Sequence, residues 1–397
     1  MTFPAPSATA RWPWLAVGSI AVSSFSIVTA EFVPVGLLAT IAREFDVTIG
    51  SAGFLVAMPA LVAAIAAPSL TLYAAQRDRR SILLALSILL AVSNLVSAVA
   101  TSWLVLLLAR FLLGIAVGGF WAIGASLAGR LVPADSSGRA TSIVYAGVSI
   151  GIVLGVPVGT AIGQAFDWRM AFAASGIVAL IAVAAQWVLL PSLRFDAALR
   201  PRDMLSVALR PGVRIVLLVT LVAIGAQYAT YTFIEPYLGQ VTELSGGYVT
   251  LALLLFGGAG VAGSVLGGIG ADRSIRLTLM VVLATIAVAL AGLFAFGDRT
   301  WAAMVIMIIW GVAFGALPLC LQLWTMREAE PAIEAGSALF VSILQVAIAL
   351  GAAIGGVIVN LSGLASTMGI GALLFVVTCA LVARAGRQDQ PRPAATA

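Results

Sequence analysis

The sequence contains no lysine and no histidine, so all 21 of its basic residues are arginines. A G-x-x-x-x-G-K-[ST] phosphate loop requires lysine, and an H-E-x-x-H zinc site requires histidine. A retinal-type Schiff base also requires a lysine amine. We therefore expect no ATP hydrolysis, no metal site and no bound cofactor. The two cysteines, Cys320 and Cys379, lie far apart in apolar runs and predict free thiols rather than a disulfide framework.

Charge is also scarce. Only 9% of the 397 residues are charged and 62% are hydrophobic, with a mean hydropathy of +1.13. Soluble domains carry roughly 25% charged residues. A transmembrane helix needs about 20 apolar residues, whereas a membrane barrel shows alternation over segments of about 10. The long uninterrupted apolar runs predict a helical protein embedded in the lipid bilayer.

Apolar runs bounded by charges or turn residues predict twelve transmembrane helices. They cover about 14–41, 51–75, 81–100, 102–130, 138–165, 169–190, 213–240, 247–271, 276–296, 300–326, 332–361 and 363–384. The only long hydrophilic connection, 191–214, separates six spans from six. We predict an all-α membrane protein with an N-terminal half over 1–190, an Arg-rich linker over 191–212 and a C-terminal half over 213–397.

The arginines indicate the orientation of the chain. In a twelve-helix alternation nearly all of them fall on one side, and only Arg43, Arg169 and Arg299 fall on the other. Basic residues are enriched in cytoplasmic loops, so we expect both termini and the linker on the cytoplasmic side of the membrane. The segment 1–11 precedes an apolar run too long for a signal-peptide core, which predicts an uncleaved first span. Because the arginines are spread over short loops, no nucleic-acid partner is expected.

Glu31 lies inside the first apolar run, in I-V-T-A-E-F-V-P-V-G-L-L. An ionisable group at the bilayer centre costs roughly 2.5 to 3.5 kcal/mol and usually faces a bundle interior, forms a pair or titrates. Glu31 is therefore a candidate proton-carrying acid. The alternative is a structural ion pair or a permanently neutral carboxyl. Arg110, in the fourth span, lies at a similar depth and is a candidate partner.

The two halves share a pattern that indicates duplication. The first span contains A-E-F-V-P and the seventh I-E-P-Y, so each has an acid near a proline. Glu235, the second acid, is either a coupling residue or an outer-surface acid. Parallel six-helix repeats with a site at the midplane are typical of one class of secondary transporters.

Glycines spaced four residues apart predict close helix contacts. They are Gly114 and Gly118 in the fourth span, and Gly151, Gly155 and Gly159 in the fifth. Pro157, in the same fifth span, removes a backbone hydrogen bond.

Together these motifs resemble the major facilitator superfamily and, within it, the drug:proton antiporters. The likeness is closest to the bacterial sugar-efflux, purine-nucleoside-efflux and chloramphenicol exporters. It covers essentially the whole chain, from T-A-E-F-V-P-V-G-L-L at 29–38 to the glycine-rich eleventh span. The resemblance implies the twelve-helix fold of that superfamily, a transporter rather than an enzyme, and a monomer. The Gly and Pro motif of the fifth span, which the family associates with antiporters, implies export.

One family motif is incomplete. The loop after the second span, T-L-Y-A-A-Q-R-D-R-R, resembles the gating motif G-x-L-a-D-R-x-G-R-R, and keeps Arg79 and Arg80. Ala75 occupies the position of the family's Asp, so the latch that this Asp forms in the family is missing. The equivalent segment of the second half, G-G-I-G-A-D-R, keeps Asp272 and Arg273.

Substrate pockets combine apolar walls with a few oriented polar groups. Candidates are Phe120, Trp121, Gln227, Tyr231 and Gln345. The seventh span also offers Tyr228, and the tenth offers Gln322. Gln345 is the strongest, because an amide in an apolar helix needs partners and because it falls where the family branch commonly has Asn.

We expect a proton-coupled antiporter that exports a small molecule such as a sugar, nucleoside or drug. Its partners are protons and that substrate, and its energy source is the proton gradient. Burial favours a neutral carboxyl and a nearby cation favours the carboxylate, so Glu31 and Arg110 would couple proton entry to substrate exit. One alternative is a proton symporter for uptake, and another is a receptor or scaffold that does not transport.

Overall fold

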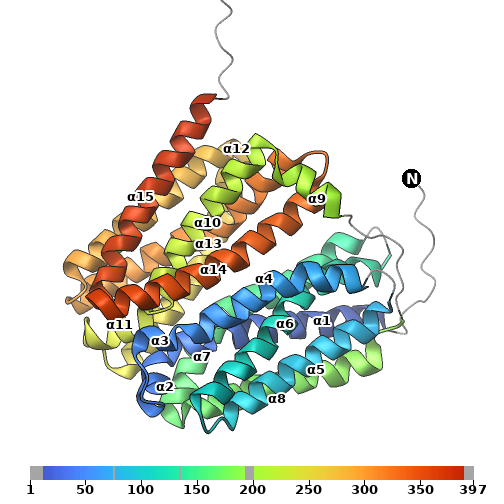
Figure 1. Ribbon diagram of the computed structural model, residues 1–397, viewed down its shortest axis with the longest axis horizontal. Coiled ribbons are helices and arrows are strands. Elements are labelled where there is room, and N and C mark those ends of the chain that lie inside the picture. The colour runs from blue at the N-terminus through green and yellow to red at the C-terminus, as the bar shows by residue number, and fades with distance from the viewer. Residues whose placement is uncertain (1–11, 75–76, 134–135, 193–200, 389–397) are drawn as a thin grey trace, which may run out of the picture.

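The computed structural model describes residues 12–74, 77–133, 136–192 and 201–388, which form helices and turns and no strand (Figure 1). The N-terminal part comprises α1 (Pro13–Phe32), η1 (Val33–Gly36), α2 (Leu38–Glu44), α3 (Ile49–Ala52), α4 (Phe54–Ala74), α5 (Arg79–Ala98), α6 (Trp103–Leu127), η2 (Ala128–Arg130), α7 (Ser137–Ala165) and α8 (Trp168–Leu189). The C-terminal part comprises α9 (Pro201–Ala208), α10 (Pro211–Tyr231), α11 (Ile234–Gln240), α12 (Gly246–Phe296), α13 (Thr300–Ala329), α14 (Ile333–Ser362) and α15 (Leu364–Gln388).

Helices of the described residues account for the twelve predicted spans, apart from Ala75 at the end of the second one. Eleven helical segments are long and apolar enough to cross a membrane. One of them, α12, has 51 residues and is interrupted at Ser274, whose φ of −161° and ψ of 104° are not helical. Each part, 246–273 and 275–296, is long enough for a span of roughly 20 residues. The chain is therefore a multi-pass membrane protein.

The first and seventh spans are broken, where the sequence predicted continuous helices. Pro34 has no N–H, so α1 ends at Phe32 and the 3₁₀ turn η1 leads into α2. In the seventh span α10 ends at Tyr231, and α11 begins at Ile234 with Pro236 in its first turn. A proline is tolerated there because the first N–H groups of a helix have no intrahelical acceptor.

The predicted glycine faces do bring helices together. A Cβ atom on Gly114 would lie 2.6 Å from the carbonyl oxygen of Pro59, and one on Gly118 2.6 Å from that of Ala63, so α6 packs directly on α4. In α7, the glycines face α1 and the start of η1. An added Cβ atom would lie 3.0 Å from Phe25 O at Gly151 and 3.1 Å from Thr29 Cα at Gly155. At Gly159 it would lie 3.0 Å from Val33 Cγ2, in η1. Pro157 is buried inside α7.

The two halves lie side by side, with α14 along α4 (Figure 1). Helix α12 also contacts α7. We call the end of the bundle that carries α2, α3 and α11 the α3 end. There the backbones of Gly50 and Gly356 are in contact, and Thr250 Oγ1 donates to Gln164 Oε1 at 3.3 Å. The linker helix α9 lies at the opposite end (Figure 1). The halves are thus joined at the α3 end.

Candidate functional site

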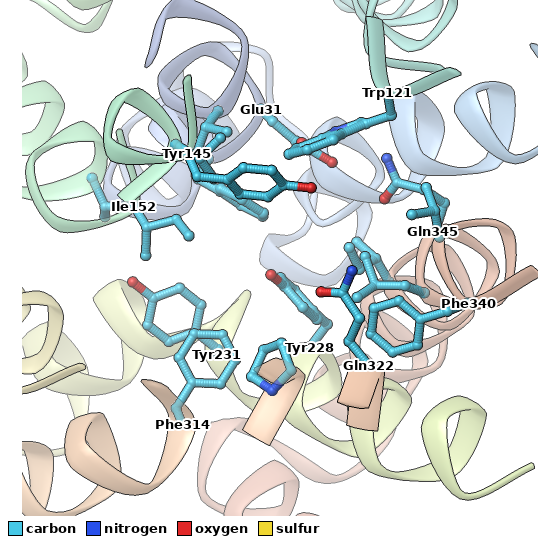
Figure 2. Close-up of a pocket in the computed structure, with 18 residues that line it drawn as sticks. Glu31, Trp121, Tyr145, Ile152, Tyr228, Tyr231, Phe314, Gln322, Phe340 and Gln345 are labelled. Atoms are coloured by element: carbon cyan, nitrogen blue, oxygen red, sulfur yellow. The ribbon is translucent and has the colours of Figure 1, made fainter. Parts of the chain in front are cut away.

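A cavity of about 240 Å³ lies between the two halves, lined from the N-terminal side by α1, α6 and α7 and from the C-terminal side by α10, α13 and α14 (Figure 2). Its wall is mainly apolar. The residues that bring polar atoms or an indole are Glu31, Trp121, Tyr145, Tyr228, Tyr231, Gln322 and Gln345. This combination of apolar wall and few polar groups is typical of small-molecule sites.

Among the described residues that line the cavity, Glu31 is the only carboxylic acid and none is an arginine. Its side chain is 3% exposed, and its Oε1 atom has no hydrogen-bond partner in the described part of the chain. Gln345, from the other half, points into the same region (Figure 2), and its amide interacts with the Glu31 carboxyl. Gln345 Oε1 also has no partner. Two unsatisfied polar atoms therefore face the cavity from opposite halves.

Arg110 does not form the ion pair with Glu31 that the sequence analysis considered. It is fully buried inside the N-terminal half, where Nη1 donates to the carbonyl of Ala30 at 2.9 Å and Nη2 to Ser97 Oγ at 3.0 Å. Its guanidinium also lies over the ring of Phe172, 4.8 Å from the centroid. In an α-helix the carbonyl of residue 30 accepts from the N–H of residue 34, and Pro34 has none. Arg110 donates to the Ala30 carbonyl in place of that missing N–H, and Ala30 directly precedes Glu31.

Glu235 is placed at the contact between the halves rather than in the cavity. Its Oε2 accepts a hydrogen bond at 3.2 Å from the backbone N–H of Ala39, in the first turn of α2. A carboxyl at a helix N-terminus satisfies an N–H that has no intrahelical partner. Glu235 therefore links the two halves at the α3 end.

Among the predicted substrate contacts, Trp121, Tyr231 and Gln345 line the cavity, and Phe120 and Gln227 do not. Phe120 is 1% exposed and packs in the core of the N-terminal half. Gln227 is fully buried, and its Oε1 accepts from Trp310 Nε1 at 3.0 Å. Each is the chain neighbour of a cavity residue, and successive residues of an α-helix point about 100° apart.

Among the lining residues with polar atoms, Tyr145 is the one that sequence reasoning missed, and the residues of the apolar wall were not predicted either. In the sequence, Tyr145 is the single tyrosine of the fifth span, and it precedes Gly147 by two residues. The weaker candidates Tyr228 and Gln322 also line the cavity. Tyr228 stacks on Phe32 of the other half, with 5.7 Å between the ring centroids. The aromatic wall therefore crosses the boundary between the halves.

The gating motifs lie away from the cavity. Asp78 caps α5 by accepting from the backbone N–H of Arg80 at 3.3 Å, and Arg80 Nη2 donates to Trp187 O at 2.6 Å. Arg79 is buried, whereas Asp272 and Arg273 are exposed just before the break at Ser274. Ala75, which replaces the family's Asp, lies outside the described residues.

Comparison with known proteins gives a consistent result. The model of the Major Facilitator Superfamily matches residues 20–342. The chain is 34% identical over 384 residues, 95% of each chain, to the "Transcription regulatory protein OpdE" of Pseudomonas aeruginosa. It is also 34% identical over 376 residues, 94% of each chain, to the "Purine ribonucleoside efflux pump NepI" of Salmonella enteritidis PT4.

Two solved structures share the fold. A bacterial homolog of the human lysosomal transporter Spinster matches with a TM-score of 0.75 and 17% identity, covering 96% of this chain and 98% of the other. A D-xylose-proton symporter matches with a TM-score of 0.74 and 18% identity, covering 94% and 97%. At these identities the likeness establishes the fold alone. The family match, the curated relatives and the twelve spans agree: this chain belongs to the major facilitator superfamily and is a membrane transporter rather than an enzyme.

Proposed function

We propose that the protein is a proton-coupled antiporter that exports a small neutral compound by alternating access, and that proton and substrate compete for Glu31. The observation that carries the proposal is the Glu31 carboxyl, which is buried in the cavity between the halves and whose Oε1 atom has no hydrogen-bond partner among the described residues. None of the described residues that line the cavity is an arginine, so besides the Gln345 amide the partners available to this acid are a proton and the donor groups of a substrate. The cycle is driven only if the inward-open and outward-open conformations differ in their affinity for the proton and for the substrate.

The wall of the cavity supports a flat, polar substrate. Tyr228 and Phe32 form a stacked pair at the boundary between the halves, and Gln322 and Gln345 supply amides that both donate and accept hydrogen bonds. A heteroaromatic ring with a hydroxylated substituent, as in a nucleoside, uses both features. The printed name of the relative from Salmonella, a purine ribonucleoside efflux pump, supports the same class. Sugars and uncharged drugs are the competing classes.

The direction of transport rests on the orientation of the chain. The arginine distribution favours a cytoplasmic linker end and cytoplasmic termini, in the inner membrane of a bacterium. The α3 end, where the halves are joined, is then outside. This is the conformation in which an exporter accepts substrate from the cytoplasm. One chain supplies both walls of the cavity, so we expect a monomer to suffice.

The test measures accumulation of radiolabelled inosine, with xylose and chloramphenicol as further substrates, in everted membrane vesicles with an acidic interior. Antiport predicts accumulation that an uncoupler abolishes. Accumulation in right-side-out vesicles instead would indicate a symporter, and absence of flux for every compound would favour a receptor. The first of these outcomes would contradict the proposed direction of transport, and the second would contradict transport itself.

The same assay tests Glu31. Glu31→Gln should abolish gradient-driven accumulation at unchanged protein level, because an amide cannot release a proton. Exchange of labelled for unlabelled substrate without a gradient should persist. The matched control is Glu243→Gln, which alters an exposed acid outside the cavity. Normal accumulation by Glu31→Gln would contradict the assignment of Glu31 as the coupling acid.

A further inference from the structure

A second cavity, also of about 240 Å³, lies on the other side of α1, between α1, α7 and α8. None of its lining residues in the described part of the chain is charged. Val28, Glu31 and Phe32 of α1 face the central cavity, whereas Ser26, Thr29 and Val33 face this one. Helix α1 therefore separates two cavities at the level of Glu31.

Three hydroxyl groups that line this second cavity are buried without a hydrogen-bond partner in the described residues: Ser26 Oγ, Thr29 Oγ1 and Ser175 Oγ. Ser26 is 0% and Ser175 5% exposed. A helical Ser or Thr has a local alternative, because its hydroxyl can donate to the carbonyl four residues earlier. Ser24 donates in this way to Ile20 at 3.0 Å and Thr160 to Val156 at 2.8 Å. The three hydroxyls that line the second cavity do not.

The second cavity opens away from the central one. Leu154 and Val158, which line it, are 38% and 47% exposed. On the same helix, Ile152 and Val156 line the central cavity instead. Exposure alone does not distinguish the two sides, since Ile152 is 41% exposed and lines the central cavity. Leu154 and Val158 are each offset by two residues from Ile152 and Val156, which places the two pairs on opposite sides of the helix. The wall formed by Leu154 and Val158 therefore faces away from the central cavity, on the side where a membrane protein meets the bilayer.

We infer that the second cavity binds a neutral, bilayer-soluble amphiphile with a short apolar body and one hydrogen-bonding group. The apolar body matches the aliphatic wall, and the polar group satisfies the hydroxyls of Ser26, Thr29 and Ser175. The volume is sufficient, since an apolar cavity of roughly 150 Å³ binds benzene. A charged ligand is disfavoured, because no lining residue carries a compensating charge. The site is distinct from the central cavity and does not depend on the direction of transport.

The test uses two photoreactive probes, a diazirine derivative of octanol and the same derivative of octane, with the full-length protein in detergent. Labelled peptides are mapped by mass spectrometry, and each variant is compared with the wild type for the same probe, which cancels differences in partitioning. The octanol probe should label 154–162 and 171–178. Ala174→Phe, which fills the cavity, should abolish this labelling. Ile177→Phe adds similar bulk at an exposed position of the same helix and should leave it unchanged.

The hydroxyls are tested separately. The double substitution Ser26→Ala and Ser175→Ala should weaken octanol labelling about threefold to tenfold, as expected for the loss of hydrogen bonds, and leave octane labelling unchanged. Equal loss for both probes, labelling spread over the outer surface, or labelling that survives Ala174→Phe would overturn the proposal. So would absence of labelling, which would indicate a cavity that holds water alone. Unchanged thermal unfolding of each variant excludes misfolding as the cause.

Discussion

At the scale of single residues, the central cavity depends on how α1 ends. Pro34 removes the N–H that would bond the carbonyl of Ala30, and Arg110 supplies a donor in its place at 2.9 Å. The same guanidinium bonds Ser97, so it ties α1 to α5 from within α6. The buried guanidinium, which has no acid beside it in the described residues, bonds a carbonyl and a hydroxyl through its two Nη atoms and lies over an aromatic ring, while its Nε atom has no partner there. Arg110 positions the turn that carries Glu31.

This arrangement makes a double-mutant prediction. Arg110→Ala should destabilise the protein by about 1.5 to 3 kcal/mol, the range for hydrogen bonds to charged groups. In a Pro34→Ala background the cost should be smaller, because residue 34 then has an N–H that can reach Ala30 O. The free energies of unfolding of the wild type, the two single variants and the double variant, measured in mixed micelles, give the coupling between Arg110 and Pro34. An equal cost of Arg110→Ala in both backgrounds would contradict the role assigned to Pro34.

At the scale of the elements, glycine faces fix which helices touch. The contact of α6 with α4 leaves no room for a methyl group at Gly118, where a Cβ would lie 2.6 Å from Ala63 O and 2.9 Å from Ala67 N. Both neighbours are backbone atoms, which cannot rotate away. Close approach of backbones through small residues is a main source of helix association in membranes. The register of α6 on α4 is therefore set by the spacing of Gly114 and Gly118.

We predict that Gly118→Ala destabilises the protein by about 1 to 3 kcal/mol, as overpacking does. Gly258→Ala is the matched control, because nothing lies within 4 Å of its added Cβ. The control should be neutral or slightly stabilising, since alanine is a better helix former than glycine by about 0.5 to 1 kcal/mol. Thermal unfolding in detergent measures both. Equal melting temperatures for the two variants would show that the close contact at Gly118 is not maintained.

At the scale of the whole molecule, the two halves are joined at the α3 end by backbone contact and by side chains. Gly50 meets Gly356, Gln164 meets Thr250, and Glu235 meets Ala39. The linker helix α9 lies at the other end. Alternating access requires these contacts to break while others form. Under the proposed alternating-access mechanism, the surface at the α3 end is thus the part of the fold that separates in each cycle.

A cross-link should test this separation. Gln164→Cys with Thr250→Cys, in a background without Cys320 and Cys379, should form a disulfide on oxidation, because the native side chains are in contact. The oxidised protein should lose substrate exchange, and a reductant should restore it. Adding Gly356→Val, which crowds the Gly50 backbone, should slow disulfide formation. Full exchange activity of the oxidised protein would contradict the opening of this end.

Much of the fold could be predicted from the sequence, because the length of an apolar run and the presence of a charge in it are local properties. The twelve spans were predicted with boundaries close to those observed. The glycine contacts followed from spacing, and Trp121, Tyr231 and Gln345 were identified as cavity residues. The break after Glu31 was missed, although Pro34 is visible in the sequence.

The sequence by itself determined that this chain is a bundle of membrane helices with one acid in its first span. Only the tertiary structure decided which way each side chain faces. Helical periodicity relates residues on one helix, but it does not give the rotation of that helix against its neighbours. For that reason Phe120 and Gln227 are buried in the packed interior between helices, while Trp121 and Tyr228 face the cavity. For the same reason Arg110 meets a carbonyl rather than Glu31, and three hydroxyls gather around a second cavity.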